Sequence, residues 1–263
     1  QGALQTEDIV NAHDIDGRPF LTIVKRTAGH RIRAHGYADF DVDEDRRHIL
    51  CRPVPGCPEA IMAQLFIDRV LPNTVSRPDT PAFHSSVIAH QGKAAMFMGD
   101  PGLGKSTLAS ALCPPAEWVC DDSAILRVKN NRIEVHASYS FARLFDDSLG
   151  AVGGEQNDRA SARNHKWRLP RRTASGPQAV ALIFSLASDG PLRLERKTRR
   201  DGVTELARHL YRLDPSDRGA LLEELGSLDR IARAVPIHEL HFPRDYDTLP
   251  DVQARILAEL ARA

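Results

Sequence analysis

The sequence contains few cysteines, no long apolar run and no excess of charge of either sign. The four cysteines (Cys51, Cys57, Cys113 and Cys120) do not have the spacing of a zinc site, so we expect reduced thiols. Apolar runs stay well short of the roughly 18 residues that a membrane-spanning helix needs, and the N-terminus lacks a signal-peptide pattern. Lys plus Arg total 35, as do Asp plus Glu, which gives no support for a nucleic-acid or membrane partner. These absences favour a cytoplasmic protein.

The length and composition are those of a globular α/β protein. The chain has 263 residues, of which 42% are hydrophobic and 27% charged. Short alternating segments near the N-terminus predict an antiparallel β meander at 20–25, 30–35, 37–42 and 48–51. A helix at 59–71, closed by Pro72, is expected to follow. We therefore expect residues 1–78 to form a β-rich region with one helix, packed on a core formed by residues 79–263.

Within that core, hydrophobic periodicity predicts alternating strands and helices. Apolar runs predict a hairpin at 87–98, a second hairpin at 125–135 and strands at 180–185, 192–194 and 235–240. Helical spacing is found at 107–112, 203–210, 215–234 and 250–263. Residues 150–178 are rich in glycine, basic residues and proline, and predict a mobile loop region.

A glycine-rich stretch between a predicted strand and a predicted helix fits the pattern G-x-x-x-x-G-K-[ST] of phosphate-binding loops. Its glycines allow backbone N–H groups to point at phosphate oxygens, and the positive end of the helix adds to the attraction. In this pattern Lys105 reaches the β- and γ-phosphates and the Ser106 hydroxyl binds Mg²⁺. The residues predicted to bind the nucleotide are Gly99, Asp100, Pro101, Gly102, Leu103, Gly104, Lys105, Ser106 and Thr107.

Two adjacent carboxylates, Asp121 and Asp122, follow a short apolar strand fifteen residues after Ser106. A carboxylate at this place supplies the second Mg²⁺ ligand in phosphate-binding-loop proteins. Two of them allow one to hold the metal while the other accepts a proton from an attacking hydroxyl. Spacing alone does not say which does which, and such pairs also occur as simple turns.

Two further features have both a functional and a structural interpretation. His84 stands at the head of the first predicted hairpin, which would place it near the mouth of the loop, although a lone histidine is more often structural. The stretch 159–172 carries six Lys or Arg residues, among them Lys166 and Arg168. They can contact a γ-phosphate or an acidic substrate, or belong to a solvated loop.

Together, the segment from His84 to Leu108 and the following Val119-Cys-Asp-Asp122 resemble the catalytic core of the HPr kinase/phosphorylase family, and more closely its short HPr-kinase-like bacterial relatives. A histidine before a strand pair, a G-D-x-G-x-G-K-S loop and an Asp-Asp pair occur in that order in both. Weaker similarity extends over 141–148, which includes Arg143, and over 235–245.

The resemblance implies a kinase core related to phosphoenolpyruvate carboxykinase, with a mixed central sheet, flanking helices and an N-terminal β region. It further implies transfer of the γ-phosphate of ATP, with Mg²⁺, to a serine or threonine hydroxyl of a peptide or protein. His84, Lys105, Asp121 and Asp122 would be catalytic, with Ser106 and the two aspartates holding the metal. Arg143, Lys166 and Arg168 would contact substrate or the γ-phosphate, and Asp122 is favoured as the base.

The chain departs from the full family enzymes in two ways. It lacks their R-G-L-G segment and a recognisable counterpart of their N-terminal domain, which puts HPr and the reverse phosphorolysis in doubt. Short relatives beside lasso-peptide genes phosphorylate a precursor peptide, which remains an open interpretation, and homo-oligomerisation also stays open. The alternatives are a small-molecule hydroxyl kinase on the same fold, a nucleotide-driven ATPase or switch, and a degenerate sensor that binds nucleotide without turnover. No N/T-K-x-D guanine motif is present.

Overall fold

The chain divides into two compact units, each with its own sheet. The computed structural model describes residues 8–15, 17–129, 132–153, 166–187 and 190–263. The first unit comprises the described residues up to Arg77 together with Tyr211–Glu223, and the second comprises Pro78–Leu210 and Glu224–Ala263. In the described parts of the chain, none of the helices is long and apolar enough to cross a membrane.

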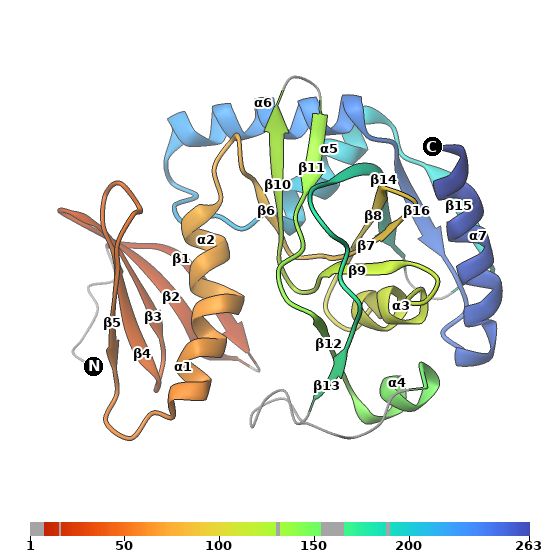
Figure 1. Cartoon of the computed structure of the whole chain (residues 1–263). Helices are drawn as coiled ribbons and strands as arrows, with labels where there is room; N and C mark the ends of the chain where they lie inside the picture. The colour runs from red at the N-terminus through yellow and green to blue at the C-terminus, as the bar shows by residue number, and fades with distance from the viewer. Residues whose placement is uncertain (1–7, 16, 130–131, 154–165, 188–189) are drawn as a thin grey trace. The chain divides into compact units, whose positions relative to one another are not determined.

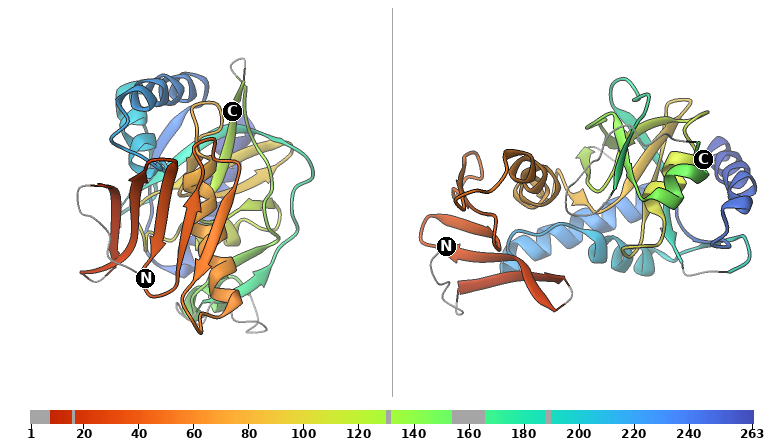
Figure 2. Two further views of the ribbon diagram at one scale, coloured as in Figure 1. Left: turned by 90° about the vertical axis from the view of Figure 1, so that its left-hand side faces the viewer. Right: turned by 90° about the horizontal axis from the view of Figure 1, so that it is seen from below.

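The first unit is built on an antiparallel sheet whose strands follow one another in sequence order (Figure 2, left). They are β1 (Ile9–Ile15), β2 (Arg18–Arg26), β3 (Gly29–Ala34), β4 (Ala38–Val42) and β5 (Ile49–Pro53). Because strand side chains alternate between faces, Ile23, Ile32 and Phe40 are buried in one core, which they share with Leu65 and Val70. The predicted meander is therefore confirmed, while β1 was missed because its residues do not alternate between apolar and polar and are mostly exposed.

The helical segment that follows extends beyond Pro72, where the sequence predicted its end. It consists of α1 (Glu59–Leu65), a π-helical turn η2 (Phe66–Val70) and α2 (Leu71–Val75). Pro72 was expected to close the helix, but it lies in the first turn of α2. Pro72 has no N–H to donate to the turn before it, and the preceding residues Phe66–Val70 form a π-helical turn in place of an α-helical one.

The second unit contains a mixed sheet in the order β6-β10-β11-β14-β8-β7-β9, with β16 between β14 and β15. β14 runs parallel to β8 and β16, and the remaining pairs are antiparallel. The strands are β6 (Ala82–Phe83), β7 (Ser86–His90), β8 (Lys93–Met98), β9 (Glu117–Cys120), β10 (Ala124–Lys129), β11 (Arg132–Val135), β14 (Gln178–Leu186), β15 (Arg193–Arg196) and β16 (Ile237–His241). The predicted α/β class with a mixed central sheet is confirmed at this level.

A separate two-stranded sheet pairs β12 (Phe141–Leu144) with β13 (Trp167–Pro170). The prediction of a loop over residues 150–178 is therefore wrong for Trp167–Pro170. Residues 154–165 of that prediction lie outside the described part of the chain.

Helices cover both faces of the mixed sheet (Figure 1). The helices after α2 are α3 (Lys105–Ala111), α4 (Asp146–Ala151), α5 (Arg199–His209), α6 (Arg218–Ala234) and α7 (Leu249–Arg262). Leu206 of α5 and Leu228 of α6 share one core with Met96 of β8. Ile256 of α7 belongs to the other core, with α3 and the neighbouring Phe97. Alternation along β8 thus fixes the sheet between two helical layers.

Candidate functional site

A tight loop joins the carboxyl end of β8 to α3. The glycines allow its path, since Gly99 has φ 150° and Gly104, which caps α3, has φ 80°. A Cβ on Gly99 would lie 3.2 Å from the Cβ of Leu186 and 3.3 Å from its carbonyl oxygen. The loop therefore needs glycine at these positions, and strand, loop and helix follow in the predicted order.

The Lys105 side chain turns back under this loop. Its Nζ donates to the carbonyl oxygens of Gly99 at 2.7 Å and Asp100 at 3.2 Å, and the residue is buried. Burial lowers the pKa of Lys105, although the charges of Asp122 and Asp121 raise it. The loop therefore holds a buried ammonium group whose partners are backbone carbonyls.

Asp121 is fully buried between two serine hydroxyls. Its Oδ1 accepts hydrogen bonds from Ser86 at 2.6 Å and from Ser106 at 2.8 Å. Its Oδ2 is buried and has no hydrogen-bond partner among the described residues. Burial and the neighbouring charge of Asp122 raise the pKa of Asp121. A buried carboxylate oxygen without a partner is costly, and a cation would remove that cost.

Asp122 lies next to Asp121 in a different environment. Its backbone has φ 59°, which an aspartate tolerates better than most residues. Its Oδ2 lies 2.8 Å from a terminal nitrogen of Arg143, and its Oδ1 lies 3.6 Å from Nε2 of His84. Burial acts to raise the pKa of Asp122, but His84 and the charges of Arg143 and Lys166 outweigh it and hold the pKa well below its usual range.

His84 lies between β6 and β7 along the chain, and a backbone hydrogen bond holds it in place. Its N–H donates to the carbonyl of His209 in α5 at 2.8 Å. About a quarter of its side chain is exposed, as is a quarter of that of Asp122. The histidine–aspartate pair therefore stands at the open side of the cluster, whereas Asp121 is closed off.

Arg143 is the basic residue most closely integrated into the site. It is buried on β12, and it donates to the Tyr139 hydroxyl at 3.2 Å in addition to its contact with Asp122. The Tyr139 hydroxyl in turn donates to the backbone carbonyl of Asp121. This network fixes the left-handed turn at the aspartate pair from the side of the small sheet.

Lys166 and Arg168 lie on the strand region that pairs with β12. The Lys166 ammonium lies 5.0 Å from the ring centre of Phe145. Its charge lowers the pKa of Asp122, an influence smaller than those of burial, His84 and Arg143. The Arg168 guanidinium stacks on Phe141 at 5.0 Å. The structure thus brings Lys166 into the field of the site and leaves Arg168 on an aromatic face. Residues 159–165 of the basic stretch lie outside the described residues.

The remaining predicted nucleotide-binding side chains have structural contacts of their own. The Asp100 carboxylate lies 3.5 Å from Arg208, with both groups more than half exposed. The Thr107 hydroxyl donates to Ser148 at 3.0 Å, and the carbonyl of Leu103 accepts from Arg244 at 2.5 Å. These contacts hold the loop against α4, α5 and the segment that follows β16.

Sequence reasoning missed two residues that shape the site, Ser86 and Tyr139. Ser86 is a fully buried polar residue within the apolar β7, a signal that could have been read beside His84. Tyr139 gave no such signal because its role depends on the path of the chain after β11. The structure does bring His84, Lys105, Ser106, Asp121 and Asp122 into one cluster, as the spacing predicted.

The donor set fits a divalent cation of the magnesium type. Carboxylate and hydroxyl oxygens are hard ligands, and the Asp121 carboxylate and the Ser106 hydroxyl offer them side by side. Magnesium usually takes few protein ligands and keeps waters and phosphate oxygens. One serine and one or two aspartates therefore suffice for this chemistry.

Comparisons with known proteins add a structural likeness. No family model matches the chain, and neither does any curated protein. Among solved structures the chain is similar to the HPr(Ser) kinase/phosphatase from Coxiella burnetii, with 12% sequence identity and a TM-score of 0.37. The match covers 69% of this chain and 97% of that one. A likeness of this degree says nothing about what this chain binds or transforms.

Proposed function

We propose that the chain is a Mg-ATP-dependent kinase that transfers the γ-phosphate to a serine or threonine hydroxyl of a peptide or protein. One observation carries the proposal. The Asp121 carboxylate accepts a hydrogen bond from the Ser106 hydroxyl at 2.8 Å while its second oxygen is buried without a partner. A metal ligand pair at the foot of a glycine-rich loop is the arrangement that phosphoryl transfer requires.

ATP is assigned to the loop of residues 99–107. Its backbone N–H groups are the proposed phosphate donors, made accessible by the glycines. In this assignment Lys105 exchanges the carbonyls of Gly99 and Asp100 for the β- and γ-phosphates. The exchange keeps the buried ammonium paired with oxygen and adds a charge that stabilises the transferring phosphoryl group.

Ser106 and Asp121 are the proposed Mg²⁺ ligands. Bound there, the cation would neutralise charge on the β- and γ-phosphates. The Ser86 hydroxyl donates to Asp121 Oδ1 at 2.6 Å and holds that carboxylate in place. This division of labour leaves Asp122 for the acceptor side of the site.

Asp122 and His84 are proposed to receive the acceptor hydroxyl. As the bond from the γ-phosphorus to its bridging oxygen breaks and the bond to the acceptor oxygen forms, the hydroxyl proton passes to Asp122. Because the pKa of Asp122 is depressed, it stays ionised and orients the hydroxyl, taking the proton late in a loose transition state. Arg143 and Lys166 are the proposed cationic contacts of the transferred group.

A peptide or protein acceptor, such as a lasso-type precursor peptide, is favoured over HPr because the R-G-L-G segment is missing from the sequence. The test is transfer of ³²P from labelled ATP to a precursor peptide, an HPr-type protein and a panel of small alcohols. Label in the peptide supports the proposal, and label in a small alcohol shifts it to a metabolite kinase. Release of free phosphate with no acceptor labelled would replace it by an ATPase.

Lys105→Ala serves as the site variant in this assay, and Lys93→Ala is its matched control. Lys93 is a half-buried lysine at the start of strand β8, whose ammonium contacts only the carbonyl of Ala261 among the described residues. We expect Lys105→Ala to abolish detectable transfer, a loss of about 10³-fold or more, and Lys93→Ala to leave it unchanged. Equal activity of both variants would contradict the proposed phosphate site.

A further inference from the structure

The first unit contains a hollow on its sheet that the kinase proposal does not use. The hollow has a volume of about 460 Å³, within the range of small-ligand sites. Its polar lining comes from Arg26, His30, Arg31, Asp41 and Arg52. All of these lie on β2–β5 of one unit, so the site is complete without any other part of the chain.

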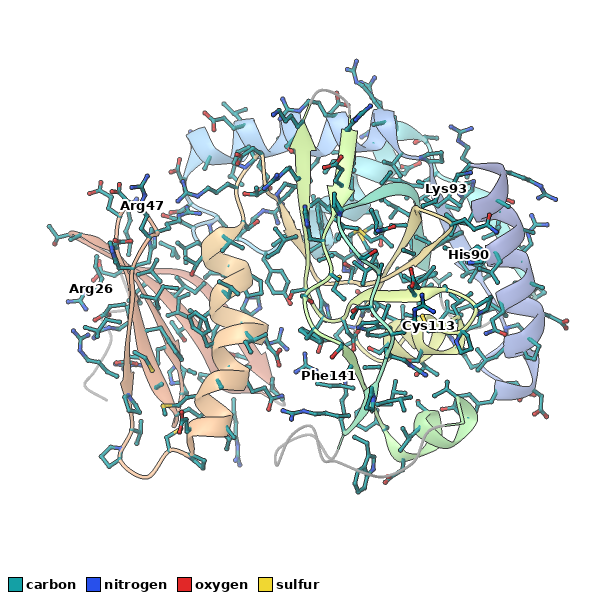
Figure 3. All side chains as sticks on the ribbon, viewed as in Figure 1. Arg26, Arg47, His90, Lys93, Cys113 and Phe141 are labelled. Atoms are coloured by element: carbon teal, nitrogen blue, oxygen red, sulfur yellow. The ribbon has the colours of Figure 1, made fainter. Side chains whose placement is uncertain are left out.

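The arginines and Asp41 of the hollow lie on the face of the sheet opposite the apolar core. Ile32 and Phe40 face the core, so their neighbours Arg31 and Asp41 point to the other face, where they form a cross-strand pair. Figure 3 shows Arg26 on the side of the sheet away from α1. One face of the meander is therefore apolar and packs in the core, and the other face carries charged residues.

Three guanidinium groups converge on the single carboxylate of Asp41. Arg31 binds it in a bidentate manner, at 2.6 Å and 2.9 Å. Arg26 reaches its Oδ1 at 3.3 Å, and Arg52 contacts its Oδ2. Asp41 therefore balances one of three positive charges.

The adjacent groups do not cancel this surplus. Arg33 and Asp39 form their own bidentate pair, with both bonds at 2.7 Å, although Asp39 also lies 3.7 Å from Arg31. Burial is the largest influence on His30 and lowers its pKa despite a contact with Asp214, so the ring is neutral at neutral pH. Four arginines and two aspartates leave a surplus of two positive charges.

Arg26 and Arg52 have hydrogen-bonding capacity to spare. Each contacts Asp41 through one terminal nitrogen, and about half of each side chain is exposed. Their other guanidinium nitrogens have no protein acceptor within the described ranges. The fork of N–H groups on a guanidinium matches the oxygens of a phosphate.

We propose that this hollow binds a phosphate group that carries two negative charges. A phosphate monoester supplies close to two charges and three acceptor oxygens in one compact group, which matches the surplus and the free N–H donors. A single carboxylate supplies one charge and would leave the other uncompensated. The phosphate is held by Arg26 and Arg52, while Asp41 fixes Arg31 between them.

The test is calorimetric titration of the full chain with inorganic phosphate at low ionic strength, in a Lys105→Ala background. That background removes phosphate binding at the glycine-rich loop, so the result does not depend on the kinase proposal. We expect saturable binding that Arg26→Gln with Arg52→Gln weakens by about tenfold or more. Arg47→Gln, an exposed arginine of the same unit outside the hollow (Figure 3), should leave the affinity unchanged.

Three results would overturn the proposal: no binding of phosphate in the Lys105→Ala background, equal binding by the double variant, or equally tight binding of succinate, which would make the hollow a dicarboxylate site. Circular dichroism checks that the double variant is folded. If it is not, Arg52→Gln alone decides, since it leaves Asp41 with two arginine partners. Unchanged phosphate affinity in that folded single variant would also overturn the proposal.

Discussion

Asp121 and Asp122 are chemically identical neighbours that the protein holds in opposite environments. Asp121 is buried with two serine donors, and its pKa is raised because burial and the neighbouring charge of Asp122 outweigh those hydrogen bonds. Asp122 contacts His84 and Arg143, which hold its pKa low against the effect of burial. At the scale of the residue, the position of an aspartate along the chain therefore does not predict its pKa. The groups that contact each carboxylate directly determine it.

The first prediction separates these two carboxylates. Asp122→Asn should lower kcat by about 10²-fold or more with little change in Mg-ATP affinity, because it removes the group that receives the acceptor proton. Asp121→Asn should instead weaken nucleotide binding in a manner that added Mg²⁺ partly restores. Steady-state kinetics and nucleotide titration at several Mg²⁺ concentrations measure both effects.

Asp251→Asn is the control for this pair, since Asp251 is exposed in the first turn of α7 and should change neither quantity. A parallel loss of Mg-ATP binding in Asp122→Asn would make Asp122 the metal ligand and reverse the assignment.

At the scale of the element, the sequence predicts structure well where local chemistry decides it. The hairpin of β7 and β8 follows from its turn, in which Gln91 and Gly92 both have positive φ between the paired residues His90 and Lys93. By contrast, the residues of β1 show no apolar alternation, and it is the pairing with β2 that makes this segment a strand. The strand at Trp167–Pro170 likewise exists through its partner β12.

The candidate site divides in the same way. Lys105, Ser106 and the aspartate pair were predictable because the loop pattern and its spacing are local signals. Ser86 gave only the signal of a polar residue in an apolar strand, and Tyr139 gave none, because their hydrogen bonds to Asp121 depend on tertiary contacts. The spacing predicted which groups meet, and the tertiary contacts set their charge states.

A prediction for the first unit concerns two glycines that share positive φ but differ in surrounding space: Gly29 follows the β2–β3 turn and Gly36 lies in the β3–β4 turn. A Cβ on Gly29, with φ 111°, would lie 2.1 Å from the carbonyl oxygen of Val42, which is backbone and cannot yield. Gly36, with φ 80°, has nothing within 4 Å of its Cβ position. Gly29→Ala should therefore lower the free energy of unfolding by about 3 kcal/mol or more, and Gly36→Ala by only about 1 kcal/mol. Urea unfolding measures both, and equal losses would show that φ alone matters.

At the scale of the whole molecule, the two units are not two consecutive stretches of chain. Tyr211–Glu223 belongs to the first unit although more than a hundred residues of the second precede it, and Leu213 is buried in the first unit's core. The sequence predicts a single boundary, after residue 78. Composition and turn signals mark boundaries along the chain, but they do not show that a later segment packs with an earlier unit. Such a return makes each unit depend on the intact chain, so stability is a property to measure on the whole protein.

The last prediction uses a half-buried histidine in each unit. Burial is the main cause that lowers the pKa of His30, against the opposing influence of Asp214, and also that of His238, against Glu259. Nδ1 of His238 is buried without a partner among the described residues. Between the lowered folded pKa and about 6.5, the unfolded chain binds more protons than the folded one, so the free energy of unfolding falls as the pH drops. Urea unfolding at about pH 7.5 and pH 5.5 should show this fall, and His30→Gln and His238→Gln should each reduce it. His136→Gln, at an exposed position, should leave the pH dependence as in the wild type. A fall that survives both half-buried-site variants would place the titrating groups elsewhere.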